Sequence, residues 1–504
     1  MAAFGLHFGT CSGCVAVYRD GRTDVVANDL GDRVTPAVVA FTDHEASVGA
    51  AAKQGIIRNA NNTVSHVKRL IGCKMGDAAV KEYKEISSVT VVDQGGSPAF
   101  EVEHKGRTVR YMPTDIMEMI YSKLLETAQS HGGSGIQDAV LAVPPEFSDT
   151  QRAIVSALAK KAGFNILRVI NEPSAAMLAF DVGQLDQTER FKTVVYRLGG
   201  TSHEATVMEV EHGMFRCVST ISDSQFGANM FTKVLQDFLA TEFKRQFRSD
   251  LRENKRAVTK LGLAAERCKH SLTTMIHAQC AVDSLYDGCD FHYTMSRARF
   301  DSLCLPLISK CTQLIDQALA QAGCGKEDIS KVIICGGGAK TPLVKKVVGD
   351  YFSSSTILNN IPEDEIIALG AAKEAALLVG DGSENVSVDQ QSKVMFKFLP
   401  KSVCLKLSAE ELEVVLPQHA LAPARRQHTL TLPAAQTCAS MEIFQADEPA
   451  TLETAQLLAK LVLRDLPPGS TIKSNFHLKR EGDLHITCHE VTSDKSESVT
   501  IPCH

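Results

Sequence analysis

No stretch of this 504-residue sequence approaches an uninterrupted apolar run of about 18 residues, so it contains no candidate membrane-spanning helix. The N-terminal segment MAAFGLHFGTCSGCVAVYRDG does not combine a basic region with an apolar core and a cleavage site, so we expect no signal peptide. The 15 cysteines are then expected to be reduced thiols, because disulfides are rare in reducing compartments. These absences predict a cytosolic protein without membrane contact.

The sequence also lacks the P-loop motif, GxxxxGK followed by Ser or Thr. The glycines and lysine of residues 323–326 have the wrong spacing, so a P-loop fold is excluded. A net charge of −6 gives no general attraction to nucleic acid, and we predict no direct sequence-specific nucleic acid binding. Cys11 and Cys14 form a CxxC pair, but no second pair follows at metal-binding spacing. We therefore predict that these two are core cysteines rather than a zinc or redox site, and we assign no metal-ligating residue.

The chain is too long for one hydrophobic core, so two or more domains are expected. In residues 1–380, strand-like and helical patterns alternate, which predicts a layered α/β domain. The expected strands are residues 15–18, 139–143, 193–198, 205–210 and 332–335, and the expected helices are residues 117–130, 150–162 and 231–246. Residues 381–392 are small, polar and aperiodic, and are predicted to be a linker.

Residues 393–504 show short apolar runs, turns and alternation with period two. Phe476, Leu478, Leu484, Ile486 and Cys488 face one way on two strands that residues 481–483 join. This pattern predicts a half-buried hairpin. We expect an all-β domain here, with at most a short helical stretch near residues 451–461.

Three apolar strands run directly into glycine, at residues 4–10, 194–202 and 332–338. Glycine at a strand end lets the backbone turn tightly and brings its N–H groups close to a phosphate. The first two segments lie about 190 residues apart, and each opens an α/β half. This spacing predicts a duplicated fold that holds phosphates between two hairpins.

These segments resemble the phosphate and adenosine motifs of the superfamily that contains actin, sugar kinases and heat shock protein 70. Other stretches narrow the resemblance to heat shock protein 70: VKRLIG at residues 67–72, LRVINEPSAA at residues 167–176 and ERCKHSL at residues 266–272. The tail resembles the peptide-binding β-sandwich of that family. The resemblance covers nearly the whole chain and implies an actin-like nucleotide-binding domain, residues 1–380, followed by a β-sandwich, residues 393–504. A sugar kinase would have no reason to carry that tail.

The resemblance implies roles in binding ATP or ADP. Lys68 would orient the water that attacks the γ-phosphate, Glu172 would hold the water shell of a metal, and Pro144 with Arg152 would relay the nucleotide state. Phosphate is expected to contact Gly9, Thr10, Gly199, Gly200, Thr201 and Ser202. Adenosine is expected to lie among Glu266, Lys269, Gly336, Gly337, Gly338, Lys340 and Asp364, and the site is expected to include Cys11, Arg197, Gly227 and His270. By themselves, Lys68 also fits a solvated surface lysine and Glu172 a helix cap.

Two positions depart from the family's pattern. Other members place an aspartate where this chain has His7 and another where it has Arg197, and those carboxylates surround Mg²⁺. Imidazole is a poor ligand for Mg²⁺, and a guanidinium about 5 Å away would repel it by roughly 7 kcal/mol at an effective dielectric constant of 20. We therefore predict ATP binding with doubtful Mg²⁺ dependence and weak or absent hydrolysis. In the alternative, both side chains point away and metal binds through Glu172 and Glu204.

Ordinary family members follow the β-sandwich with a helical lid, which we do not expect here. Without a lid, a bound peptide leaves freely, so clamping gated by ATP is lost. The lid-less form resembles the cytosolic heat shock protein 70-like subunit of the ribosome-associated complex, which partners a zuotin-type J-domain protein. The resemblance implies a regulatory subunit that reaches ribosomes and nascent chains through that partner and stimulates a second, fully active heat shock protein 70. The alternative is an ordinary ATP-hydrolysing, protein-refolding chaperone.

Overall fold

The structure is a computed structural model. It describes residues 2–19, 22–133, 135–182, 190–211, 214–380, 399, 401–406, 412–417, 424–433, 436–446, 455–479, 483–491, 493 and 495–502. The chain divides into two compact units, Met1–Asn385 and Val386–His504, and each unit is treated by itself. The linker expected at residues 381–392 lies outside the described residues.

The first half of the N-terminal unit is built on a sheet with the strand order β12-β11-β1-β2-β3, in which β4 also pairs with β2. The strands are β1 Ala3–Phe8, β2 Ser12–Arg19, β3 Arg22–Val25, β4 Thr35–Pro36, β11 Asp138–Val143 and β12 Asn165–Asn171. β1 and β2 form an antiparallel hairpin, and β1 runs parallel to β11. Helices α3 (Pro113–Gly132) and α4 (Asp149–Lys161) share a hydrophobic core with Phe4, Leu6 and Phe8 of β1.

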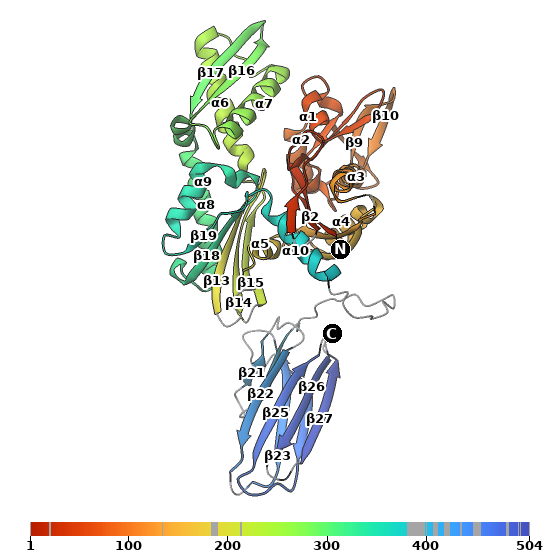
Figure 1. Cartoon of the computed structure of the whole chain (residues 1–504), viewed down its shortest axis with the longest axis vertical. Coiled ribbons are helices and arrows are strands. Elements are labelled where there is room, and N and C mark those ends of the chain that lie inside the picture. Colours follow the sequence, from red (N-terminus) through yellow and green to blue (C-terminus); the bar gives the residue numbers. More distant parts are fainter. Residues whose placement is uncertain are drawn as a thin grey trace. The chain divides into compact units, whose positions relative to one another are not determined.

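Two smaller sheets and two helices complete this half. The sheets have the strand orders β6-β5-β7 and β10-β9-β8. The elements are α1 Ala50–Gly55, α2 Ala78–Ile86, β5 Val38–Phe41, β6 Ala46–Val48, β7 Thr63–Ser65, β8 Thr90–Gln94, β9 Ser97–His104 and β10 Arg107–Tyr111. They extend the half beyond its central sheet (Figure 1).

The second half repeats the arrangement in a sheet with the order β15-β14-β13-β18-β19. β13 and β14 form an antiparallel hairpin, and β13 runs parallel to β18. The elements are β13 Arg190–Leu198, β14 His203–Glu211, β15 Met214–Asp223, β16 His277–Tyr286, β17 Cys289–Ser296, β18 Ile329–Cys335, β19 Thr356–Leu358, α6 Ala228–Phe247, α7 Lys255–Ser271, α8 Arg297–Gln321 and α9 Pro342–Tyr351. The predicted duplicated, actin-like α/β architecture is therefore confirmed.

Helices α5 (Glu172–Ala179) and α10 (Ile366–Gly380) lie between the two halves (Figure 1). Their buried side chains form one core with Ala3 of β1 and Val195 of β13. The packing brings backbones into contact: a Cβ atom on Gly370 would lie 1.7 Å from the carbonyl oxygen of Ala175. This close approach fixes the start of α5, where Glu172 lies.

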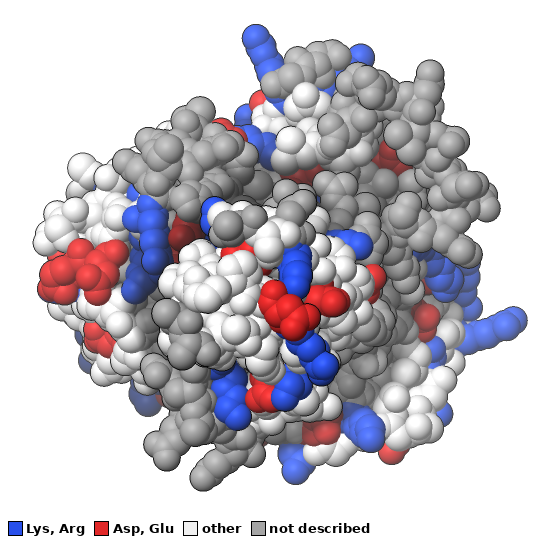
Figure 2. All heavy atoms as spheres, turned by 90° about the horizontal axis from the view of Figure 1, so that it is seen from below, with Lys and Arg blue, Asp and Glu red and all other residues white. Residues whose placement is uncertain are grey.

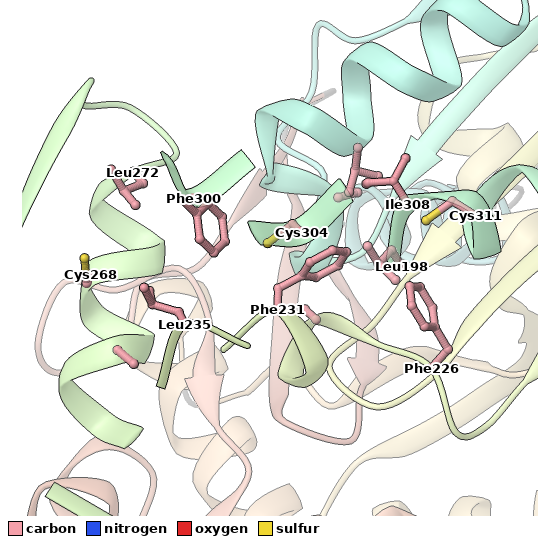
Figure 3. Close-up of a cluster of buried hydrophobic side chains, with 14 of the residues drawn as sticks. Leu198, Phe226, Phe231, Leu235, Cys268, Leu272, Phe300, Cys304, Ile308 and Cys311 are labelled. Carbon is pink, nitrogen blue, oxygen red and sulfur yellow. The ribbon is translucent and has the colours of Figure 1, made fainter. Parts of the chain in front are cut away.

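The core of the second half supports the turn that follows β13. Figure 3 shows Leu198 among Phe226, Phe231 and Ile308, which come from the approach to α6, from α6 and from α8. Each of these side chains is buried. Burial of a large apolar side chain contributes about 2 kcal/mol, so Leu198 anchors the glycine turn that follows it.

The C-terminal unit is a sandwich of two antiparallel sheets, β21-β20-β23-β24 and β22-β25-β26-β27. The strands are β20 Ser402–Lys406, β21 Leu412–Leu416, β22 Ala424–Thr431, β23 Ala439–Ala446, β24 Gln456–Leu463, β25 Thr471–Leu478, β26 Asp483–Glu490 and β27 Ser496–Pro502. In the described part of this unit, every regular element is a strand, and no helical lid is evident. The predicted β-sandwich is confirmed.

Two local expectations for this unit have different outcomes. The hairpin is confirmed, because β25 pairs antiparallel with β26 and its five apolar side chains are buried. The helical stretch near residues 451–461 is wrong where the chain is described, since residues 456–461 belong to strand β24. Pairing with β23 along the sheet overrides the weak local helical pattern.

Charged side chains of both signs are intermixed on the face that Figure 2 presents. Lysine and arginine lie next to aspartate and glutamate over the described part of that face. Among the described helices, none combines the length and apolar character needed to cross a bilayer.

Candidate functional site

A cleft of about 1150 Å³ opens between the two halves of the N-terminal unit. It takes in nearly all of the residues predicted to bind nucleotide. Those that line it are Gly9, Thr10, Cys11, Lys68, Arg197, Gly199, Gly200, Thr201, Ser202, Glu266, Lys269, His270, Gly336, Gly337, Gly338, Lys340 and Asp364. Segments from residue 9 to residue 364 thus meet around one space, and the glycine turns of both halves face it.

The turns after β1 and β13 are closed in the same way. The amide of Gly9 donates to the carbonyl of Ser12 at 2.9 Å, and the amide of Gly199 donates to the carbonyl of Ser202 at 2.8 Å. A Cβ atom on Gly200 would lie 2.2 Å from the sulfur of Cys11, so only glycine lets the two turns approach each other. The duplication therefore produces two facing backbone turns.

Gly227 lies behind the second turn and does not line the large cleft. A Cβ atom there would be 2.5 Å from the carbonyl oxygen of Gly200, and the neighbouring amides of Ala228 and Asn229 donate to Gly199 and Gly200. Gly227 therefore supports the turn from outside the cleft.

The third glycine segment packs against the second turn. Gly336 has a φ of 90°, and a Cβ atom there would lie 2.5 Å from the carbonyl oxygen of Leu198. Both its conformation and its surroundings therefore require glycine. Its amide donates to the carbonyl of Glu363 at 2.7 Å, which joins this turn to the segment that carries Asp364.

A buried carboxylate lies at the base of the cleft. Glu172 is 1% exposed and begins α5. Its oxygens lie 2.9 Å from Nε of Arg197, 3.1 Å from Nζ of Lys68 and 3.3 Å from Nε2 of His7. Burial raises the pKa of Glu172, but Lys68 and Arg197 outweigh this effect and hold it well below its usual range. Glu172 is therefore ionised and surrounded on three sides.

The two unusual residues, His7 and Arg197, carry different charges. Burial lowers the pKa of His7, and the neighbouring Glu172 raises it too little to compensate, so the imidazole is neutral at neutral pH. Burial also disfavours the charged form of Arg197, but Glu172 and Glu204 more than compensate and raise its pKa above the ordinary value. The fixed cation of the site is therefore Arg197.

Glu204 lies beside Arg197, with 3.7 Å between its Oε2 and an Nη atom of the guanidinium. Thr206 donates a hydrogen bond to its other oxygen at 3.2 Å. Burial raises the pKa of Glu204 to about 8, although Arg197 acts in the opposite direction. Burial and Arg197 therefore act on the pKa of this carboxyl group in opposite directions, and burial has the larger effect.

These contacts do not fit a site for Mg²⁺. The ion prefers several oxygen ligands, but Glu172 is already engaged by Arg197, Lys68 and His7. No group of three or more His, Cys, Asp or Glu in the described part of the chain is placed to hold a metal. The expectation that His7 and Arg197 point away, leaving Glu172 and Glu204 to a metal, is wrong because both side chains face Glu172.

The charged residues that were predicted to enclose adenosine are paired within the protein. Glu266 lies 2.9 Å from Lys53, and Asp364 lies 2.6 Å from Lys340. Lys269 donates to the hydroxyl of Thr232 at 2.8 Å. Burial lowers the pKa of His270 to about 4, so this residue presents a neutral ring.

The predicted relay residues Pro144 and Arg152 are in direct contact. The guanidinium of Arg152 donates to the carbonyl of Pro144 at 3.2 Å and to the side chain of Asn171 at 2.7 Å. Because Asn171 precedes Glu172, Arg152 connects the cleft wall at Pro144 with the start of α5.

Among the cleft residues that sequence reasoning missed are Lys53 and Glu146. Lys53 reaches Glu266 from 213 residues away in the sequence, and no local pattern indicates that pairing. Glu146 lines the cleft and faces Arg197, whose pKa it helps to raise. Glu146 lies between Pro144 and Arg152 in the sequence, and both of these were predicted to act near the site. This position could have indicated Glu146 as a cleft residue.

Two facing hairpin turns, a third glycine turn and a separate β-sandwich define the class: an actin-like nucleotide-binding domain joined to a β-sandwich. The chain belongs to the heat shock protein 70 family, because the family described as "Hsp70 protein" matches residues 3–504. Proteins of this family bind adenine nucleotides.

Curated relatives match along the entire length. The chain is 44% identical to heat shock 70 kDa protein 14 of Danio rerio over 515 residues, covering 99% of each chain. It is 41% identical to the proteins of the same name from Bos taurus and Homo sapiens, again over 99% of each chain. The chain is thus similar to these proteins in both of its units.

Proposed function

We propose that this chain binds ATP in the cleft, hydrolyses it slowly or not at all, and works as a regulatory chaperone subunit. Its partner would be a zuotin-type J-domain protein in a ribosome-associated complex in the cytosol, where the pair assists nascent polypeptides together with a second, active heat shock protein 70. The observation that carries the proposal is the Arg197–Glu172 ion pair of 2.9 Å at the base of the cleft.

The shape and chemistry of the cleft support nucleotide binding. A volume of about 1150 Å³ exceeds what a nucleotide needs. The Gly9 and Gly199 turns offer backbone N–H groups to phosphate oxygens, and Lys68 and Arg197 supply positive charge. His270 offers an uncharged ring at the adenosine side.

Slow hydrolysis follows from what surrounds Lys68. Hydrolysis of a γ-phosphate depends on a positioned water and on cations that neutralise charge as it develops. Lys68 is held by Glu172 at 3.1 Å, and the same carboxylate is held by Arg197. Arg197 neutralises charge but holds no water shell, so the site binds phosphate without activating its attack.

The partner proposal rests on the family and on the lid-less β-sandwich. In the described part of the C-terminal unit there are only strands, so these residues provide no helical cover for a bound peptide. A family member without a clamp is suited to act through a partner.

Two measurements test the proposal. In a single-turnover assay we expect ATP to remain bound and largely intact over many minutes. Turnover at the rate of ordinary family members, abolished by Lys68→Ala, would refute slow hydrolysis. In cytosol layered over a sucrose cushion, the chain should pellet with ribosomes in equal amount with a J-domain protein, and recovery only in the supernatant without such a partner would refute the complex.

An ordinary ATP-hydrolysing refolding chaperone is the second candidate. One observation favours it: the two residues predicted to act in hydrolysis, Lys68 and Glu172, are both present and in contact. This candidate requires peptide affinity that changes with the nucleotide. A labelled peptide whose dissociation rate is the same with ATP and ADP would exclude it.

A further inference from the structure

The acidic residues that line the cleft are mostly neutralised by cations of the same chain. They are Asp32, Glu82, Glu146, Glu266, Glu363 and Asp364. Arg69 lies 2.6 Å from Glu82, Lys53 lies 2.9 Å from Glu266, Lys340 lies 2.6 Å from Asp364, and Lys345 pairs with Glu363. Among the described lining residues, few carboxylates are therefore available to a metal ion.

The two remaining acidic residues are poorly placed to gather a metal. Asp32 is exposed at the rim of the cleft. Glu146 faces Arg197 and Glu204, so a metal bound there would lie against the guanidinium. The base of the cleft thus contains a cation where a metal complex would require oxygen ligands.

The guanidinium of Arg197 is built into the phosphate turn. One of its Nη atoms donates to the hydroxyl of Ser202 at 3.3 Å. A Cβ atom on Gly199 would lie 2.9 Å from the other, so the glycine makes room for the guanidinium. Arg197 is 9% exposed, and Glu172 holds its Nε. This charge therefore lies at the turn and is held there by groups of the same chain.

We propose that the cleft selects the free nucleotide anion over its magnesium complex, so that Mg²⁺ weakens binding. The inference rests on the proposed nucleotide binding and goes beyond weak metal dependence, because it reverses the sign of the metal's effect. Mg²⁺ cancels two of the negative charges that Arg197 and Lys68 attract. It also brings a divalent cation against a fixed guanidinium that cannot lose its proton.

The test is calorimetric titration of the full-length chain with ADP and with ATP, in excess EDTA and in excess magnesium chloride at matched ionic strength. We expect Kd to be at least about tenfold lower in EDTA, the factor for one screened charge interaction of about 1.4 kcal/mol. Equal or tighter binding of the magnesium complex would overturn the inference and leave nucleotide binding intact. No binding in either condition would overturn the proposed function itself.

Variants show whether Arg197 causes the difference between the Kd values in EDTA and in magnesium chloride. Arg197→Gln should bring the ratio of the two Kd values close to one, and Arg197→Asp should reverse it by supplying the oxygen ligands that Mg²⁺ prefers. The matched control is Arg190→Gln, on the same strand but paired with Glu209 away from the cleft, which should keep the original ratio. An unchanged ratio in Arg197→Gln would contradict the assignment. The ratio in the unaltered chain remains a test if either variant fails to fold.

Discussion

The two halves of the N-terminal unit place different residues at the same position. His7 is the penultimate residue of β1 and Arg197 is the penultimate residue of β13. Each strand pairs antiparallel with a hairpin partner and parallel with a strand of its own half. Both side chains reach the same carboxylate, Glu172, at 3.3 Å and 2.9 Å. The duplicated backbone thus directs two unrelated side chains to one point.

The difference between the halves is charge, and burial decides it. His7 gives up its proton in the buried site because its pKa is lowered, whereas Arg197 cannot do so. The residues opposite them in the hairpins differ accordingly: Cys14 pairs with His7, and Glu204 pairs with Arg197. A neutral side chain needs no compensation, but a buried cation needs carboxylates beside it.

Removing the shared carboxylate should have the largest effect. Glu172→Gln leaves Arg197 and Lys68 buried without their anion, which should lower the free energy of unfolding of the N-terminal unit by about 3–5 kcal/mol. Urea unfolding followed by circular dichroism measures it. The control is Glu118→Gln, which breaks a surface pair with Lys161 and should leave the midpoint nearly unchanged. Similar midpoints for both variants would contradict the prediction that Glu172 stabilises the buried charges of Arg197 and Lys68.

A substitution at the contact between α5 and α10 should destabilise the protein almost as much. In Gly370→Ala the new Cβ would lie 1.7 Å from the carbonyl oxygen of Ala175, so α10 must move away from α5. We expect a loss of about 3 kcal/mol and a lower thermal midpoint. Gly55→Ala, at the end of α1 with open space around it, should be neutral or slightly stabilising. Equal effects would show that α5 and α10 are not tightly packed.

His7 and Arg197 contact the same carboxylate but differ in charge, so comparing the stability of variants at the two positions should show the contribution of the charge. Arg197→Gln removes a buried cation and should cost about 3 kcal/mol, whereas His7→Gln removes one neutral polar contact and should cost about 1 kcal/mol. Urea unfolding of the two variants under identical conditions gives the difference of about 2 kcal/mol. A larger effect for His7→Gln would mean that the imidazole, rather than the guanidinium, holds Glu172.

A smaller, pH-dependent effect on stability should arise from His203 in the second half. His203 is buried against Tyr196 and Phe226, and burial lowers its pKa to about 4 from an ordinary value of 6.5. As pH falls from 6.5 towards 4, the unfolded chain takes up the proton first, so stability decreases over this range. His203→Phe should make that slope shallower by up to about 1.4 kcal/mol per pH unit. Urea unfolding at several pH values measures it, and an unchanged slope would contradict it.

The sequence pattern predicted the architecture because strands and turns depend on residues that are close together in the sequence. Alternating apolar runs identified the strands of both halves, and glycine at three strand ends marked the turns that now face one cleft. Motif resemblance placed Lys68 and Glu172 in the site. Prediction failed near residues 456–461, where pairing with β23 overrides a weak helical pattern. Gly227 was predicted to line the site, but it lies behind the turn, where the close approach of Gly200 leaves no room for a Cβ atom.

The amino-acid sequence by itself determined the family, the duplicated fold and the presence of His7 and Arg197 in place of two aspartates. Only the tertiary structure decided that both side chains face Glu172, that His7 is neutral, and that burial raises the pKa of Glu204. The physical reason is that charge state depends on burial and on neighbours from distant segments. Neither of these is encoded in the spacing of residues along the chain.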